Sequence, residues 1–138
     1  MPTLPTVLVI DDDDAARYLS SRLLHRLGLR EQVTEAANGQ QALLLLEAAC
    51  TTGQPLPQLI LLDLNMPVLN GFELLERYTE LPAQCRQAST IVVLSSSEQP
   101  ADIDAALRVA TEFINKPLTE TQLRRLLRQY AGYSPTEA

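Results

Sequence analysis

The sequence predicts an α/β fold in which five parallel strands form one doubly wound sheet. Short apolar runs of strand length alternate five times with longer segments whose apolar residues recur at helical spacing, and this alternation is typical of βαβ units. The run Val7–Ile10 is apolar throughout, as expected of a central strand that helices cover on both faces. A chain of 138 residues has room for one such domain, which we expect over residues 1–138 with its core at about 6–131.

The first strand is predicted at Val7–Ile10, and four consecutive aspartates follow it. The next helix is expected to end at Gly28, because glycine readily adopts the left-handed conformation that ends many helices. The buried face predicted for this helix carries four leucines, namely Leu19, Leu23, Leu24 and Leu27.

Four further strands and four further helices follow in alternation. The strands are predicted at 32–36, 59–62, 91–94 and 112–115. The helices are predicted at 42–49, at 72–79, at 101–108 and after Thr119 or Thr121, either of which can cap the last one. The turn dipeptides Asn38-Gly39 and Asn70-Gly71 precede two of these helices, and residues 51–57 are predicted to form a surface loop. The last helix buries Leu123, Leu126, Leu127 and Tyr130, and a short polar tail at 132–138 follows it.

The composition is that of an ordinary globular protein. Hydrophobic residues make up 46% of the chain, charged residues make up 20%, and the formal net charge is -6. An anionic surface repels phosphate backbones and anionic lipids, so direct binding to nucleic acid or to a membrane is not expected. The chain has no apolar run of membrane-spanning length and no signal-peptide pattern, so we expect a cytoplasmic protein. Cys50 and Cys85 have no metal-binding or redox-motif spacing, and we expect two free thiols.

Polar residues follow the predicted strands at their carboxyl ends, where open parallel sheets bind ligands. Asp11 and Asp12 end the first strand, Asp63 the third, Ser95 the fourth and Lys116 the fifth. Two carboxylates about 4 Å apart repel each other by roughly 4 kcal/mol at an effective dielectric constant of 20, so cations are needed among them. A hard divalent ion with oxygen ligands fits, which makes Mg²⁺ the expected cofactor.

An aspartate beside a metal ion and a lysine is a credible nucleophile for phosphoryl transfer. Both cations offset the charge that the transferring group carries, and the Ser95 hydroxyl can bond to one of its oxygens. Taken alone, Lys116 and Ser95 would be ordinary surface and strand-end residues. Their common position beside Asp63 is what supports the chemical interpretation.

Four motifs carry a resemblance to a known family. They are Val-Leu-Val-Ile-Asp-Asp-Asp at 7–13, Leu-Leu-Asp-Leu-Asn-Met-Pro-Val-Leu-Asn-Gly at 61–71, Val-Val-Leu-Ser-Ser-Ser at 92–97 and Phe-Ile-Asn-Lys-Pro-Leu at 113–118. In this order and spacing, from Val7 to Tyr130, the chain resembles the receiver domains of two-component response regulators, of the single-domain type found in chemotaxis. The resemblance implies a flavodoxin-like (βα)5 fold with strand order 2-1-3-4-5.

The resemblance also implies a role for each site residue. Asp63 would be the phosphoacceptor. Asp12 would bind Mg²⁺ directly, Asp11 would act nearby through water, and the backbone carbonyl of Asn65 would complete the protein's metal ligands with Asp63. Ser95 would be the switch hydroxyl, Lys116 the cation that binds the phosphoryl group, and Phe113 the aromatic switch residue. A cis Lys116-Pro117 peptide is implied too, and the side chains of Asn65 and Ser97 would tune the loss of the phosphoryl group.

The implied partners are a histidine kinase or phosphotransfer protein and a downstream effector protein. The domain would catalyse only its own phosphorylation and dephosphorylation. A homodimer through the face of 101–108, 112–115 and the last helix is left open; alternatively the arginines of that helix, Arg124, Arg125 and Arg128, are simply solvated. Two other functions remain. A degenerate receiver would act as a binding module without phosphorylation, and a haloacid-dehalogenase-like phosphatase would need an acid where Asn65 stands.

Some residues have simple structural interpretations. Asp13 and Asp14 are expected to cap a helix or lie in a solvated loop. Phe113 is equally compatible with a plain core position. No acidic motif accompanies His25 as it would at a phosphohistidine site, so His25 is taken as a solvated helix residue.

Overall fold

A parallel sheet of five strands forms the centre of the molecule in the computed structural model, which describes residues 4–66, 69–87 and 89–135. The strand order is β2-β1-β3-β4-β5, and all neighbouring strands are parallel. The strands are β1 Val7–Ile10, β2 Val33–Ala36, β3 Leu59–Asp63, β4 Thr90–Ser95 and β5 Glu112–Asn115. The predicted fold class and strand order are therefore confirmed.

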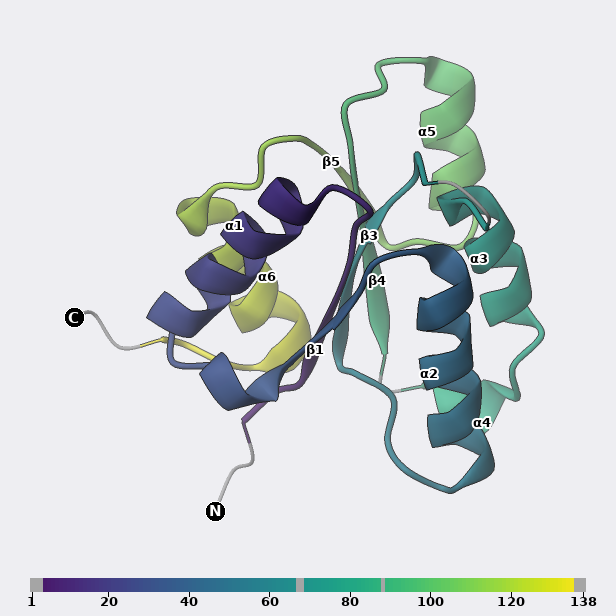
Figure 1. Ribbon diagram of the computed structural model, residues 1–138, viewed down its shortest axis with the longest axis horizontal. Helices are drawn as coiled ribbons and strands as arrows, with labels where there is room; N and C mark the ends of the chain where they lie inside the picture. Colours follow the sequence, from purple (N-terminus) through teal and green to yellow (C-terminus); the bar gives the residue numbers. More distant parts are fainter. Residues whose placement is uncertain (1–3, 67–68, 88, 136–138) are drawn as a thin grey trace.

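Helices cover both faces of this sheet. Figure 1 shows α1 and α6 on one side and α2, α3 and α5 on the other. The helices are α1 Asp14–Arg26, α2 Gly39–Thr51, α3 Gly71–Thr79, α4 Ala83–Arg86, α5 Pro100–Leu107 and α6 Glu120–Ala131, with a short 3-10 helix, η1 Arg30–Gln32, before β2. The four-residue helix α4 and η1 were not predicted, because segments this short carry no readable hydrophobic period.

Each strand contributes to two hydrophobic cores because successive side chains point to opposite faces. Val7 and Val9 of β1 pack with the leucines of α1 and α6, whereas Leu8 and Ile10 pack with those of α2 and α3. The predicted buried face of α6 is confirmed. That of α1 is wrong at Leu19, which is 60% exposed, because it lies at a solvent-open pocket between α1 and residues 116–118.

Side chains cap the helices at Asp13 and Thr119, as predicted, and also at Asn70, which was predicted only as part of a turn. The Asp13 carboxylate accepts a hydrogen bond from the backbone N–H of Ala15, and Asn70 and Thr119 each form a capping box with the residue three positions later. Gly28, after α1, has a φ of 89°, the left-handed conformation expected for it.

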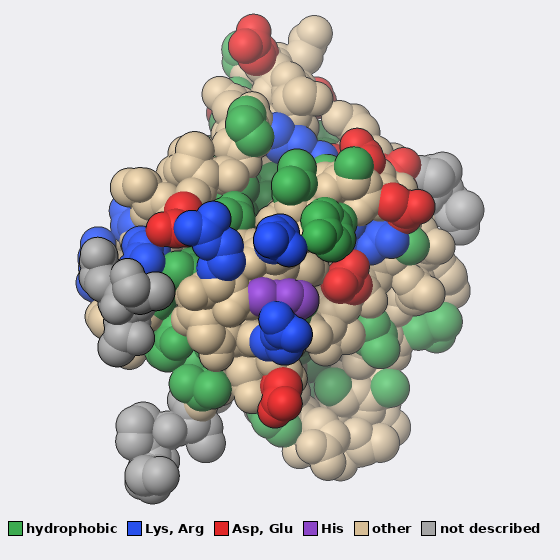
Figure 2. All heavy atoms as spheres, turned by 60° about the vertical axis from the view of Figure 1, so that its left-hand side comes forward, with side chains coloured by type: hydrophobic (Ala, Val, Ile, Leu, Met, Phe, Trp, Pro, Cys, Tyr) green, Lys and Arg blue, Asp and Glu red, His purple; other side chains and the backbone are tan. Residues whose placement is uncertain are grey.

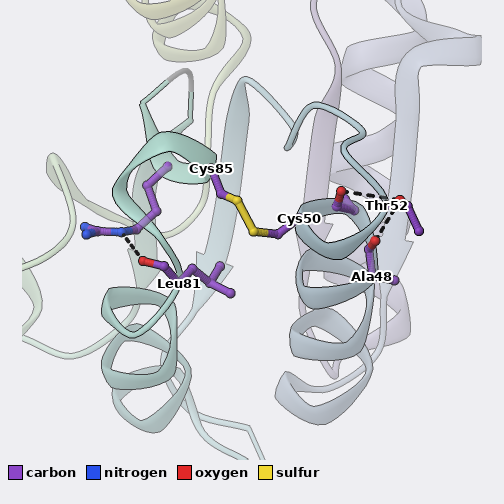
Figure 3. Close-up of a disulfide and its surroundings, with 7 residues drawn as sticks. Ala48, Cys50, Thr52, Leu81 and Cys85 are labelled. Atoms are coloured by element: carbon purple, nitrogen blue, oxygen red, sulfur yellow. Dashed lines mark hydrogen bonds between the residues drawn. A yellow bond between two sulfur atoms is a disulfide. The ribbon is translucent and has the colours of Figure 1, made fainter.

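The cysteines do not behave as expected. Cys50 in the last turn of α2 and Cys85 in α4 form a disulfide, with their Cα atoms 5.6 Å apart (Figure 3). The prediction of two free thiols is wrong because α4 returns the chain to the end of α2, although 35 residues separate the two cysteines in sequence. Two hydrogen bonds hold this region, one from Arg86 to the carbonyl of Leu81 and one from Thr52 to that of Ala48.

Some sequence features lie outside the described residues. They are Pro67 and Val68 of the 61–71 motif and residues 136–138 of the polar tail. Among the described residues, no helix is both long and apolar enough to cross a membrane.

Candidate functional site

Three aspartates meet where β1 and β3 end side by side. Asp11 and Asp12 follow β1, Asp63 is the last residue of β3, and these two strands are neighbours in the sheet. One carboxylate oxygen from each aspartate lies within 4.8 Å of the others. Asp11 and Asp63 are buried, whereas Asp12 is exposed, so the group opens to solvent on the Asp12 side.

Lys116, the single lysine of the chain, reaches this group from the end of β5. Its Nζ atom lies 2.9 Å from Oδ2 of Asp11 and 3.5 Å from Oδ1 of Asp63. Burial disfavours the charged form of the amine. The hydrogen bond to Asp11 and the charge of Asp63 outweigh this effect, so the pKa of Lys116 lies above its ordinary value. The lysine is therefore a fixed positive charge between two carboxylates, and its peptide bond to Pro117 is cis.

Asp63 is held in an unusual electrostatic environment. The residue is 6% exposed, and its Oδ1 atom accepts a hydrogen bond from the backbone N–H of Asn65 at 3.3 Å. Burial, followed by the nearby charge of Asp11, raises the pKa of Asp63 from 3.8 to about 6, although Lys116 acts in the opposite direction. The site thus places three carboxylates near one lysine, an arrangement whose charge a further cation would balance.

The end of β4 adds hydroxyl groups beside these charges. Ser95 is completely buried, its Oγ atom accepts a hydrogen bond from the N–H of Ser97, and its carbonyl accepts one from the N–H of Lys116. The Ser97 hydroxyl in turn donates to the Asp102 carboxylate in the first turn of α5, at 2.7 Å. A chain of hydrogen bonds thus leads from the buried serine to α5.

Phe113 lies on β5 opposite Val93 of β4 and packs, half-buried, against the core on the α2, α3 and α5 side. This position suits a plain core residue as well as a side chain that changes its exposure.

Gly71 allows the segment after Asp63 to pack closely. A Cβ atom at this position would lie 2.6 Å from the Cα atom of Leu64 and 2.9 Å from the carbonyl oxygen of Asp63. Real Cβ atoms essentially never approach backbone atoms so closely, so only glycine fits here. The residue therefore helps to position the end of β3.

Arg17 is part of the site and was missed from the sequence. Its guanidinium group donates to the backbone carbonyl of Asp11 at 2.8 Å and pairs with Asp14 and Glu35. The spacing of Asp14 and Arg17, three residues apart on a helix, was the available signal. The contact with Glu35 depends on β2 lying beside β1, which only the fold reveals.

The remaining candidates lie elsewhere. His25 is near the far end of α1, at a pocket lined by arginines. Arg125 is more than a solvated residue, because it makes a two-pronged ion pair with Glu112, which also accepts a hydrogen bond from the Tyr130 hydroxyl. This cluster ties α6 to β5.

The arrangement at the sheet edge combines a buried carboxylate, a lysine amine and two further carboxylates. Comparisons with known proteins place the chain in a family. A family model described as the response regulator receiver domain matches residues 7–128.

Two relatives differ in how much of their length matches. The two-component response regulator 24 of Arabidopsis thaliana is 30% identical over 131 residues, which cover 95% of this chain and 87% of that protein. The autoinducer 1 sensor kinase/phosphatase LuxN of Vibrio harveyi is 33% identical over 123 residues, which cover 89% of this chain but only 13% of LuxN.

Among solved structures, the receiver domain of the sensor histidine kinase PA1611 from Pseudomonas aeruginosa PAO1 superposes with a TM-score of 0.77 at 23% identity, covering 95% of this chain and 100% of that one. That structure has a magnesium ion coordinated in its active site cleft. The likeness concerns the fold.

Proposed function

Since the chain belongs to the response regulator receiver domain family, we propose that it performs the phosphoryl-accepting step of two-component signalling, with Asp63 as the phosphoacceptor. The observation that supports this most directly is the position of the Asp63 carboxylate, buried at the end of β3 and 3.5 Å from the Lys116 amine. A nucleophile for phosphoryl transfer needs such a cation, because the transferring group carries negative charge.

The donor in this proposal is a phosphohistidine of a histidine kinase or a phosphotransfer protein. An oxygen of Asp63 forms a bond to phosphorus while the bond from phosphorus to the donor's imidazole nitrogen breaks. The nitrogen leaves with the electron pair and takes up a proton. At neutral pH Asp63 is mostly ionised, because its pKa of about 6 lies below 7, so the carboxylate needs no separate base.

The donor atoms of the site fit Mg²⁺. Three carboxylate oxygens within 4.8 Å of one another are the hard ligands that this ion prefers. Asp11, Asp12 and Asp63 would hold the ion together with the backbone carbonyl of Asn65. When bound, Mg²⁺ supplies further positive charge against the oxygens of the phosphoryl group.

Ser95 connects the reaction to a change of shape in this proposal. Its hydroxyl turns toward the phosphoryl group on Asp63 and gives up the hydrogen bond from Ser97. Because Ser97 also holds Asp102, the movement reaches the first turn of α5, and Phe113 can move into the space that Ser95 leaves. An effector protein would read this change, and the face of α5, β5 and α6 is the candidate surface for it or for a homodimer.

We propose that residues 1–138 form a single receiver domain. A cytoplasmic location goes with the reaction, because phosphohistidine donors are made from ATP in that compartment. Disulfides in the cytoplasm are exposed to cellular dithiols. The Cys50–Cys85 bond would then be open to reduction by these dithiols.

The experiment is to incubate the protein with acetyl phosphate and follow its intact mass with and without Mg²⁺. We expect one phosphoryl group on the wild type only when Mg²⁺ is present, and none on Asp63→Asn. The matched control is Asp104→Asn, which makes the same change at an exposed position of α5 and should still be labelled. Failure of the wild type to take up a phosphoryl group would contradict the proposal and leave a receiver-shaped binding module.

A further inference from the structure

A second charged surface lies away from the aspartates and has the opposite sign. The C-terminal half of α1 and the start of η1 line a shallow pocket of about 170 Å³, whose lining consists of Arg22, His25, Arg26 and Arg30. Figure 2 shows this side of the molecule, with the histidine between side chains of lysine or arginine. The cluster is unusual for a chain whose formal net charge is -6.

The local structure explains how the three arginines and the histidine come together. Arg22, His25 and Arg26 are spaced i, i+3 and i+4 on α1, so they share one face of the helix. Gly28 turns the chain with its positive φ, and Arg30 at the start of η1 comes back beside that face. At 1.5 Å per residue, Arg26 lies about 18 Å along the helix from Asp14, next to the aspartate site. The two sites are therefore at opposite ends of α1.

Some arginines elsewhere in the protein have close acidic partners that Arg22 and Arg30 lack. Arg17 pairs with two carboxylates and Arg125 pairs with Glu112. At the pocket, Arg26 approaches Glu120 only to 3.6 Å and its side chain is 66% exposed. Within residues 4–66, 69–87 and 89–135, no carboxylate lies at ion-pair distance from Arg22 or Arg30.

Favourable interactions with the helix dipole explain only some of the basic residues at this pocket. Cations in the last turn of a helix interact favourably with its dipole, and this accounts for His25 and Arg26. It does not account for Arg22, one turn earlier, or for Arg30, which lies beyond the helix. A ligand of opposite charge accounts for all four.

The neighbouring side chains point to a protein ligand. Tyr18, one turn before Arg22, is 60% exposed, and its hydroxyl accepts a hydrogen bond from the Arg22 guanidinium. Exposed tyrosine and arginine side chains are enriched where proteins bind each other. The cations are spread along a helix and a turn, so they match several carboxylates in a row better than one small anion.

We propose that this basic face, formed by Tyr18, Arg22, His25, Arg26 and Arg30, docks an acidic segment of a partner protein. The rest of the anionic surface repels such a segment, which restricts binding to this face. Because the pocket residues Arg22, His25, Arg26 and Arg30 lie toward the other end of α1 from Asp63, docking can occur with Asp63 phosphorylated or not. The inference does not depend on the proposed phosphorylation.

The test uses hexaglutamate as the probe and the amide spectrum of the labelled protein as the readout, at low and at physiological salt. We expect shifts at residues 18–30 that weaken as salt rises, because exposed charges are screened beyond about 10 Å at 0.1 M ionic strength. The variant Arg22→Gln/Arg26→Gln/Arg30→Gln should bind about tenfold more weakly, as expected for the loss of three exposed ion pairs.

The matched control is Arg77→Gln/Arg108→Gln/Arg128→Gln, which makes the same change of net charge at exposed arginines of other helices. It should bind like the wild type, and unchanged amide spectra elsewhere show that both variants are folded. Equal weakening by the control, or shifts outside the basic face, would overturn the proposal. Inorganic phosphate that perturbs the same amides at the same or lower concentration would also overturn it, because the site would then be one for a small anion.

Discussion

The Cys50–Cys85 disulfide leads to a quantitative prediction about stability. The bond joins residues 35 positions apart, and the chain-entropy relation assigns about 4 kcal/mol at 25 °C to closing a loop of this length in the unfolded state. Both cysteines are only half-buried, Cys50 at the end of α2 and Cys85 at the edge of a hydrophobic core, so exchange for serine adds little packing cost. We expect Cys50→Ser/Cys85→Ser to lose about 2–4 kcal/mol of unfolding free energy.

The assay is urea unfolding followed by far-ultraviolet circular dichroism. Three samples are compared: the oxidised wild type, the wild type reduced with a phosphine, and the double variant. The last two should unfold at the same, lower urea concentration, with a fall in melting temperature of roughly 10 °C. The phosphine should have no effect on the double variant, which controls for direct action of the reagent.

Two results would refute the reasoning. If reduction leaves the unfolding free energy unchanged to within about 0.5 kcal/mol, the loop-closure calculation is wrong for this protein. If iodoacetamide alkylates both cysteines in the untreated native protein, the two thiols are not joined.

The remaining predictions concern the site and the contacts around it. Asp63→Asn should stabilise the metal-free protein at pH 7–8 by up to about 3 kcal/mol. The pKa of Asp63 in the folded protein is raised, so the unfolding free energy of the wild type falls as pH rises from 3.8 through about 6. Urea unfolding across this range should show that the extra stability of Asp63→Asn disappears near pH 4. A stability difference between the two proteins that does not change with pH would contradict the raised pKa of Asp63. Lys116→Gln should slow labelling by acetyl phosphate by a factor of roughly 100 to 1,000, measured by intact mass against time, and an unchanged rate would remove the lysine from the reaction. Gly71→Ala should cost roughly 1–3 kcal/mol in unfolding free energy, because a Cβ atom has no room against Leu64; a fully stable variant would mean that the chain after Asp63 adapts easily. A double-mutant cycle of Glu112→Gln and Arg125→Gln should give a coupling of about 1 kcal/mol, whereas a coupling near zero would show that their two-pronged pair is fully screened.

Most of the fold could be predicted because strand and helix periods are local properties of the sequence. The strand runs and the longer amphipathic segments gave the correct order of the predicted elements. The helices expected after the Asn38-Gly39 and Asn70-Gly71 turns begin within one to three residues of their predicted starts. The position of the site followed from one further fact, that parallel strands end at the same edge of a sheet. Asp11, Asp12, Asp63, Ser95 and Lys116 therefore came together as expected.

The features that were missed depend on how distant segments pack. Cys50 and Cys85 meet because a four-residue helix ends beside α2, and no sequence period indicates such a helix. Arg17 of α1 pairs with Glu35 of β2, the strand beside β1. Leu19 satisfies the helical period of α1 but faces a pocket that residues 116–118 leave open.

The central claim, that Asp63 accepts the phosphoryl group, is tested most directly by locating that group on the chain. The protein is labelled with acetyl phosphate and Mg²⁺, treated with borohydride to reduce the acyl phosphate to an alcohol, alkylated at its thiols and sequenced by tandem mass spectrometry. The account predicts homoserine at position 63 and unmodified aspartates at 11 and 12. Homoserine at position 11 or 12, with Asp63 unmodified, would contradict it.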